Sequence, residues 1–161
     1  MTLDEIMKAA VLPALALLPP VMDRPQARVM LLTIGQQESR FTDRVQKGGG
    51  PAHGFWQFES GGGVKGVMTH ADSQALAQQV CVARGVPFER AQVYAALATD
   101  DILAAAFARL LLWTDPRALP GRDDAQGGWD LYARVWRPGR PHRETWNAFY
   151  AKAVQTIYQG K

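Results

Sequence analysis

Apolar residues recur along most of this chain at spacings of three and four, which is the pattern of amphipathic helices. Alanine and leucine are abundant and long β-branched runs are missing, so the pattern predicts an all-α protein. Proline and glycine separate the periodic runs. The expected helices cover residues 3–18, 24–39, 71–84, 87–98, 101–113, 123–136 and 142–158.

Side chains that suit helix ends support these boundaries. The expected capping residues are Thr2, Asp23, Thr69 with Asp72, Thr99 or Asp100, and Asp123 or Asp124. Pro13 should bend or split the first helix, and Gly85 is placed to end the helix over 71–84. The pair Gly127-Gly128 should weaken the helix that ends at Trp136.

The second helix is apolar on almost every side between Val29 and Ile34, which predicts a central position. Four polar residues then follow at once, Gln36 to Ser39. Polar side chains that close a buried helix need hydrogen-bond partners or a cleft. This run is therefore the first indication of a site.

A glycine-rich stretch comes next, with eight glycines between residues 42 and 68. Such a composition disfavours a stable helix and predicts a long loop, and long loops inside compact domains are usually functional. The aromatic cluster within it, residues 54–59, should form a short strand or a turn.

Composition predicts one globular domain over residues 1–161, because the length suits one core and 47% of the residues are hydrophobic. The formal charge is +3, with Lys and Arg scattered rather than clustered, which disfavours a nucleic-acid binder. A mild positive field suits an anionic polymer.

The N-terminal apolar run is too short to span a membrane and lacks a clear signal-peptide pattern, because Asp4 and Glu5 precede it. Cys81 should be a buried thiol.

Glu38 is the first candidate for chemistry. A carboxylate at the end of an apolar helix is partly desolvated, which raises its pKa, and glycosidic cleavage needs an acid that keeps its proton near neutral pH. The alternative is a glutamate paired with a surface arginine such as Arg40. Ser39 could orient Glu38 or hold the loop, and Glu59, with Asp43 behind it, is the candidate second carboxylate.

The cluster Gly54-Phe55-Trp56-Gln57 suits a sugar, because glycine lets a backbone approach a ligand, an aromatic ring covers C–H faces and an amide pairs with hydroxyl or N-acetyl groups. The alternative is that its aromatic residues fill the core beneath the loop, which we prefer for Phe55 and Phe58. Gly54, Trp56 and Gln57 are thus candidate substrate-binding residues, and Ser39, Tyr132 and Arg137 are further candidates for this role.

Other site chemistries are weakly indicated. No G-x-S-x-G motif is present, and the histidines lack obvious triad partners. No H-x-x-x-H or C-x-x-C pair exists, so no metal is assigned, and no cofactor is expected. Tyr132 and Trp136 share one helix face, which is typical of a core as well as of a cleft. Arg137 could bind a carboxylate of a substrate.

Glu38-Ser39 at a helix end, followed by Gly54-x-x-Gln57, resembles the lysozyme-like superfamily. The pattern is similar to soluble lytic transglycosylases and to phage tail or virion-associated muralytic proteins, which show E-S, then G-L-M-Q, then A-Y-N-x-G. Phe55-Trp56 replaces Leu-Met here. The third motif is absent as such, and its nearest counterpart is 129–139, in which Tyr132 would stand for the tyrosine that contacts the acid.

The resemblance implies a single lysozyme-like domain that cleaves the β-1,4 glycan of bacterial peptidoglycan, with Glu38 as the sole acid and base and Ser39 beside it. It implies a phage or prophage protein, present in the virion or in the host cytoplasm before delivery to the periplasm, with tail or virion proteins as partners. The alternatives are an inactive lysozyme-like module that binds glycan or builds a virion, and a DNA-binding helical protein, which would show steeply salt-dependent duplex binding.

Overall fold

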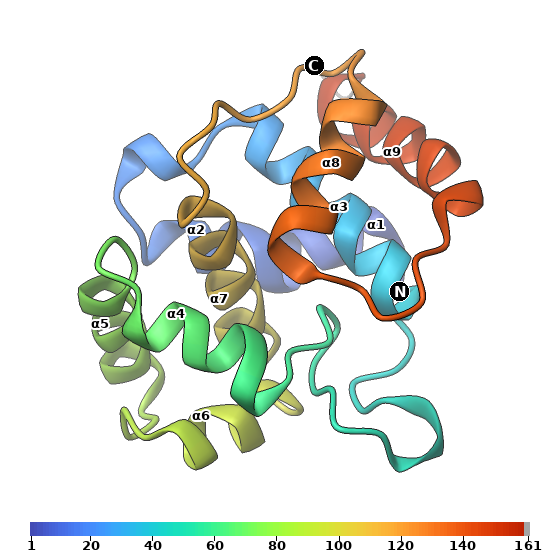
Figure 1. The fold of residues 1–161 in the computed structure, drawn as a ribbon. Helices are drawn as coiled ribbons and strands as arrows, with labels where there is room; N and C mark the ends of the chain where they lie inside the picture. Colours follow the sequence, from blue (N-terminus) through green and yellow to red (C-terminus); the bar gives the residue numbers. More distant parts are fainter. Residues whose placement is uncertain (160–161) are drawn as a thin grey trace.

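Helices form most of the protein in the computed structural model, which describes residues 1–159 (Figure 1). The α-helices are α1 (Leu3–Ile6), α2 (Leu12–Ala16), α3 (Pro25–Ser39), α4 (Lys65–Thr69), α5 (Gln74–Arg84), α6 (Arg90–Leu97), α7 (Asp101–Trp113), α8 (Ala125–Trp136) and α9 (Arg143–Tyr158). Shorter turns of helix are η1 (Met7–Val11), η2 (Pro20–Met22), η3 (Lys47–Gly49) and η4 (Ser60–Val64). The described residues contain isolated β-bridges but no strand, so the all-α prediction is confirmed.

The first helix runs through α1, η1 and α2, and the residues at their junctions all have right-handed helical φ and ψ angles. Its middle part, η1, is a π-helical turn. Within that turn the Leu12 N–H donates to Met7 O, five residues back. Pro13 follows, and proline has no N–H and crowds the carbonyl four residues before it. Pro13 was expected to bend or split this helix. Instead, the wider turn accommodates the proline, and the chain stays helical from α1 through α2. Thr2 and Glu5 form a capping box, as predicted for Thr2.

Helix α7 is the centre of the single compact domain, because it contacts η1 and the helices α2, α3, α4, α5, α6 and α8. Every residue from Leu103 to Leu112 is buried. Figure 1 shows α3, α8 and α9 on one side of α7 and α4, α5 and α6 on the other. The sequence indicated α3 as the central helix. That helix is also buried over most of its length, but α7 is the helix that joins the two groups.

Helix α8 includes Gly127-Gly128, the two glycines expected to weaken it. A Cβ on Gly128 would lie 2.6 Å from a ring atom of Tyr150 in α9. The absence of a side chain therefore allows α8 to pack closely on α9. This close approach offsets the low helix propensity of glycine.

The second half of the glycine-rich stretch is helical, which corrects the prediction of a loop as far as residue 68. Residues 60–69 form η4 and α4. Val64, Val67 and Met68 are buried there at positions i, i+3 and i+4, so their packing outweighs the low helix propensity of the glycines around them. The loop proper is confined to residues 40–59.

Most helix boundaries lie within three residues of their predicted positions, but two predicted caps are wrong. Asp23 does not cap α3, because its carboxylate binds Arg28 at 2.8 and 2.9 Å. Thr69 ends α4 instead of starting the next helix. Asp100 and Asp124 do cap α7 and α8, and Gly85 ends α5 in the left-handed conformation. No helix within residues 1–159 is both long enough and apolar enough to cross a membrane.

Candidate active site

The last turn of α3 places Glu38 opposite Tyr132 of α8. The Tyr132 hydroxyl donates a hydrogen bond to Glu38 Oε1, with 2.8 Å between the oxygens. The two residues are 94 positions apart in sequence. They are brought together by the tertiary fold, in which α3 and α8 both pack against α7 and α9. The alternative partner proposed for Glu38 is not used, since the Arg40 guanidinium donates to the Gln36 and Gln37 carbonyls.

Glu38 keeps its proton at unusually high pH. Burial raises its pKa to about 7, because the charged form loses solvation. The hydrogen bond from Tyr132 opposes this rise, and the negative charge of Glu59 adds to it. Glu38 is therefore divided between protonated and ionised forms near neutral pH, which is the condition that a group needs in order to donate and then accept a proton.

Tyr132 is a neutral and well-oriented donor. Its ring is 3% exposed and stacks on Trp146 with 5.0 Å between ring centroids. Burial, and secondarily the neighbouring Glu38, raises the pKa of Tyr132 above its ordinary value, so the hydroxyl keeps its proton at any working pH.

We expect Tyr132→Phe to raise the pKa of Glu38 further, by about one unit, because a hydrogen bond to the carboxylate is lost while the burial remains. Site-specific 13C NMR titration of the Glu38 carboxyl measures this change. Tyr150→Phe is the matched control, since its hydroxyl donates to Gly121 O and does not contact Glu38. A Glu38 pKa that stays the same or falls in Tyr132→Phe would contradict this account.

The other polar residues at the end of α3 are engaged in packing. Gln36 Nε2 donates to the carbonyls of Leu32 and Phe149, and Gln37 bonds His142 O and Thr145 of the α9 region. Their side chains therefore tie α3 to α9. Glu38 is the one member of this polar run whose side chain is directed to a tyrosine hydroxyl rather than to the backbone or α9.

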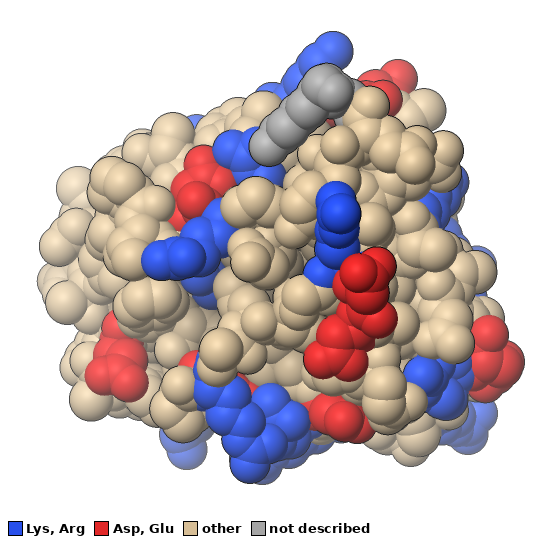
Figure 2. Space-filling view, turned by 90° about the horizontal axis from the view of Figure 1, so that it is seen from above, with Lys and Arg blue, Asp and Glu red and all other residues tan. Residues whose placement is uncertain are grey.

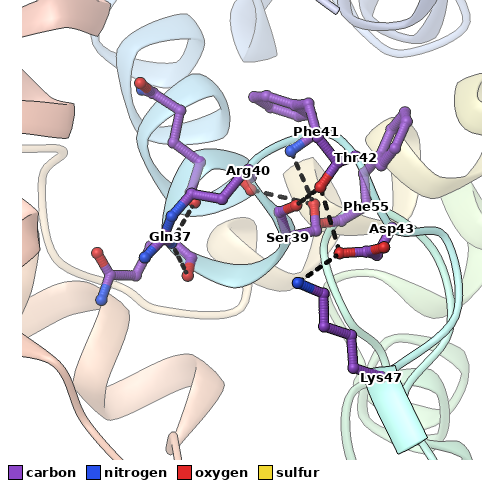
Figure 3. Close-up of polar contacts among 10 residues, drawn as sticks. Gln37, Ser39, Arg40, Phe41, Thr42, Asp43, Lys47 and Phe55 are labelled. Atoms are coloured by element: carbon purple, nitrogen blue, oxygen red, sulfur yellow. Dashed lines mark hydrogen bonds and ion pairs between the residues drawn. The ribbon is translucent and has the colours of Figure 1, made fainter. Parts of the chain in front are cut away.

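Ser39 holds the loop that follows α3. Its hydroxyl donates to Phe55 O at 2.7 Å and Gly35 O at 3.2 Å, and accepts from the Phe41 N–H at 3.1 Å (Figure 3). It is 6% exposed, so the structure places it under the loop rather than at a substrate. Of the two roles predicted for Ser39, the structure supports the one in which it holds the loop.

The turn over residues 54–57 is built by a glycine and by an unusual glutamine. Gly54 has φ +81°, and a Cβ there would lie 2.7 Å from Leu97 O, so packing against α6 requires the glycine. Gln57 has φ +53°, which is uncommon for a residue with a side chain, and its Nε2 donates to Gly54 O. Only Gln57 of these two faces a hollow on the surface.

Trp56 is not at the surface, which corrects its assignment as a substrate-binding residue. It is 0% exposed and its indole N–H donates to Leu31 O in α3. Phe55 and Phe58 are also buried, as preferred for them from the sequence. An aromatic cluster beside glycine suits both a core and a sugar platform, and only the tertiary packing separates the two.

A groove runs beside this turn, between η4 and the C-terminal end of α8. Its volume is about 670 Å³. Glu59 and Arg137, both exposed, line the groove. Gln57 lines a smaller pocket of about 60 Å³, which shares Glu59 and Trp136 with the groove. Glu38 does not line the groove itself. Glu38 is bound by Tyr132, which precedes the groove residue Trp136 by one turn of α8, so Glu38 lies beside the groove.

Sequence reasoning missed several residues of this groove. Trp136 joins the two sides, since its indole N–H donates to Trp56 O and its ring lines the groove. The far end is lined by His70, Arg117 and Arg134. The spacing of Trp136 from Tyr132 was the only available signal for the first of these. Arg134 lies on the same helix, but His70 and Arg117 come from separate segments that no local pattern relates to it.

The Asp43 carboxylate pairs with Lys47 Nζ at 3.6 Å (Figure 3). Glu59, whose negative charge raises the pKa of Glu38, is therefore the better candidate for the second carboxylate.

No other reactive centre competes with this site within residues 1–159. Burial raises the pKa of the Cys81 thiol to about 11, as expected of a structural cysteine. His53 stacks on Tyr94, and His142 lies against Glu144. The described residues contain no group of three or more His, Cys, Asp or Glu side chains placed to hold a metal ion. Acidic and basic residues are interspersed over the face shown in Figure 2.

Comparisons with protein-family models, with curated proteins and with solved structures found no match to this chain. We therefore infer the function from the geometry of the site and from the sequence motifs.

Proposed function

We propose that the protein cleaves the β-1,4 glycan of bacterial peptidoglycan, with Glu38 as general acid and then general base. The observation that carries the proposal is the Glu38–Tyr132 pair, in which a carboxyl with a pKa raised to about 7 receives a hydrogen bond from a buried tyrosine. We also propose that the all-α domain has a lysozyme-like arrangement. The motifs Glu38-Ser39 and Gly54-x-x-Gln57, with their resemblance to lytic transglycosylases, support this.

In the reaction we propose, protonated Glu38 donates its proton to the glycosidic oxygen while the C1–O bond breaks. The N-acetyl group of the substrate stabilises the positive charge that develops at C1. Glu38, now ionised, accepts the proton of the sugar 6-hydroxyl as that oxygen bonds to C1. The product carries a 1,6-anhydro ring, no water is consumed and Glu38 ends protonated, so one carboxyl suffices.

Backbone conformation gives independent support for the position of the site. Gln57 and Arg137 both have positive φ, at 53° and 49°; Arg137 lines the groove, and Gln57 lines the small pocket that shares Glu59 and Trp136 with it. Residues with side chains adopt this conformation at a cost of about 1–3 kcal/mol, and they concentrate at functional sites. In our proposal, Gln57 and Arg137 contact the sugar chain, with the amide bonding hydroxyl or N-acetyl groups and the guanidinium bonding a carboxylate.

The test is incubation of purified peptidoglycan with the wild-type protein, followed by mass spectrometry of the soluble fragments. Fragments with 1,6-anhydro ends are expected. Fragments with reducing ends would show a hydrolase, in which Glu59 holds the attacking water, and Glu59→Gln should then abolish their release. Glycan binding without any fragment release would reject the proposal in favour of a binding or virion module.

A further inference from the structure

A second cavity lies on the other side of the segment 115–117 from the groove, between η2, the start of α3 and the C-terminal end of α7. Its volume is about 600 Å³. Three arginines line it, Arg24, Arg109 and Arg117, together with the ring of Trp113. Nothing in the proposed glycan chemistry uses these residues.

Arg109 is a buried cation with no carboxylate to neutralise it. It is 2% exposed, and none of its nitrogens lies within 4.0 Å of an Asp or Glu oxygen of residues 1–159. Its Nε donates to Met22 O at 2.8 Å. Burial lowers the pKa of Arg109 to about 10, so the guanidinium is still charged at neutral pH.

The two terminal nitrogens of Arg109 are directed to the cavity. They form no hydrogen bond within residues 1–159, yet no fully buried side-chain nitrogen or oxygen there lacks a partner. Nη1 and Nη2 must therefore retain the small solvent contact that this side chain has, and the cavity is the space that Arg109 lines. A buried guanidinium whose two terminal nitrogens have no partner in the protein is costly unless water or a ligand binds them.

The neighbouring charges make the cavity positive. Arg24 is close enough for its charge to lower the pKa of Arg109, and neither Arg24 nor Arg117 has a carboxylate within 4.0 Å in the described chain. Asp115 also lines the cavity, but Arg134 binds its carboxylate at 2.9 Å. Asp72, which is exposed, also lines the cavity, so three arginines face two carboxylates there. Asp23, whose charge favours ionised Arg109, is bound by Arg28.

We propose that this cavity binds an oxyanion, a phosphate or a carboxylate, between the fork of Arg109 and the side chains of Arg24 and Arg117. Planar guanidinium groups match both anions with paired hydrogen bonds. Arg117 lines this cavity and the groove alike, so an anionic group held here can belong to the same molecule that lies in the groove. The site does not depend on glycan cleavage.

The test uses the indole N–H signal of Trp113, whose ring is 5.4 Å from the Arg109 guanidinium, in 15N NMR spectra. Inorganic phosphate and acetate are titrated separately at constant ionic strength, and a Trp113→Phe spectrum assigns the signal. Saturable movement is expected with at least one anion. Tighter phosphate binding indicates a phosphorylated ligand, and tighter acetate binding indicates a peptide or sugar carboxylate.

Arg109→Lys should weaken the binding about tenfold, because the fork is lost while the charge is kept, and Arg117→Ala should weaken it about threefold. Arg90→Ala, an exposed arginine of α6 outside the cavity, should leave it unchanged. Absence of saturable movement with both anions overturns the proposal. So does wild-type affinity in Arg109→Lys or, if that variant does not fold, in Arg117→Ala.

Discussion

Replacing Glu38 with glutamine is expected to slow the release of soluble fragments from peptidoglycan by about 10²- to 10⁴-fold, the usual contribution of general acid–base catalysis. The amide has the shape of the carboxyl and can still accept the hydrogen bond of Tyr132, but it cannot donate a proton to a leaving oxygen. Because the change also removes a partly buried carboxylate, the variant should fold at least as well as the wild type. The measurement is the initial rate of fragment release.

Glu144→Gln is the matched control for this substitution. Glu144 lies exposed in the first turn of α9 beside His142, so the control removes a carboxylate that no hydrogen bond links to Tyr132. Its rate should equal that of the wild type. Equal release by Glu38→Gln and the wild type would remove Glu38 from the mechanism.

Gly35→Ala should destabilise the protein by about 3 kcal/mol, the upper part of the usual range for overpacking. A Cβ on Gly35 would lie 2.0 and 2.2 Å from ring atoms of Phe41, the residue that folds back beneath the end of α3. That ring is 2% exposed and is packed edge-on against Phe55 and Trp56 at centroid distances of 5.5 and 5.6 Å, so it cannot move away cheaply. The free energy of unfolding, from chemical denaturation, measures the effect.

Gly66→Ala is the control for Gly35→Ala. Gly66 lies in α4, and the nearest atom to its added Cβ would be Leu111 Cδ1 at 4.0 Å, which is an ordinary contact. Alanine should therefore stabilise this helix by up to about 1 kcal/mol. The opposite signs of the two substitutions separate packing from helix propensity. A Gly35→Ala variant as stable as the wild type would show that the Phe41 ring has more room than the structure gives it.

The helices were largely predictable because their information is local. A 3.6-residue period with caps such as Asp100 and a stop such as Gly85 is contained within one short segment, and α7 begins and ends where its pattern predicts. The stretch that became η4 and α4 was not predictable in this way. Its helix depends on burying Val64 and Val67 against the core. The high glycine content of the stretch gives no indication of this burial.

The candidate site was also predictable only where the information is local. Glu38 was accessible from the sequence, because a carboxylate that closes an apolar helix is unusual wherever the rest of the chain lies. Its link to Tyr132 came from a motif resemblance, and the structure brings the two together. Trp56 was misplaced because surface and core aromatics look alike in sequence. Arg109, in an apolar helix, gave no sign that its guanidinium would face a cavity.

The dependence of the wild-type rate on pH tests the central claim most directly. The measurement is the initial rate of fragment release from purified peptidoglycan between pH 4 and pH 9. Because the acid must carry its proton and the pKa of Glu38 is about 7, the rate should fall as pH rises through about 7, by about tenfold per unit above it. A rate that is unchanged across pH 7, or no release at any pH, would contradict the account.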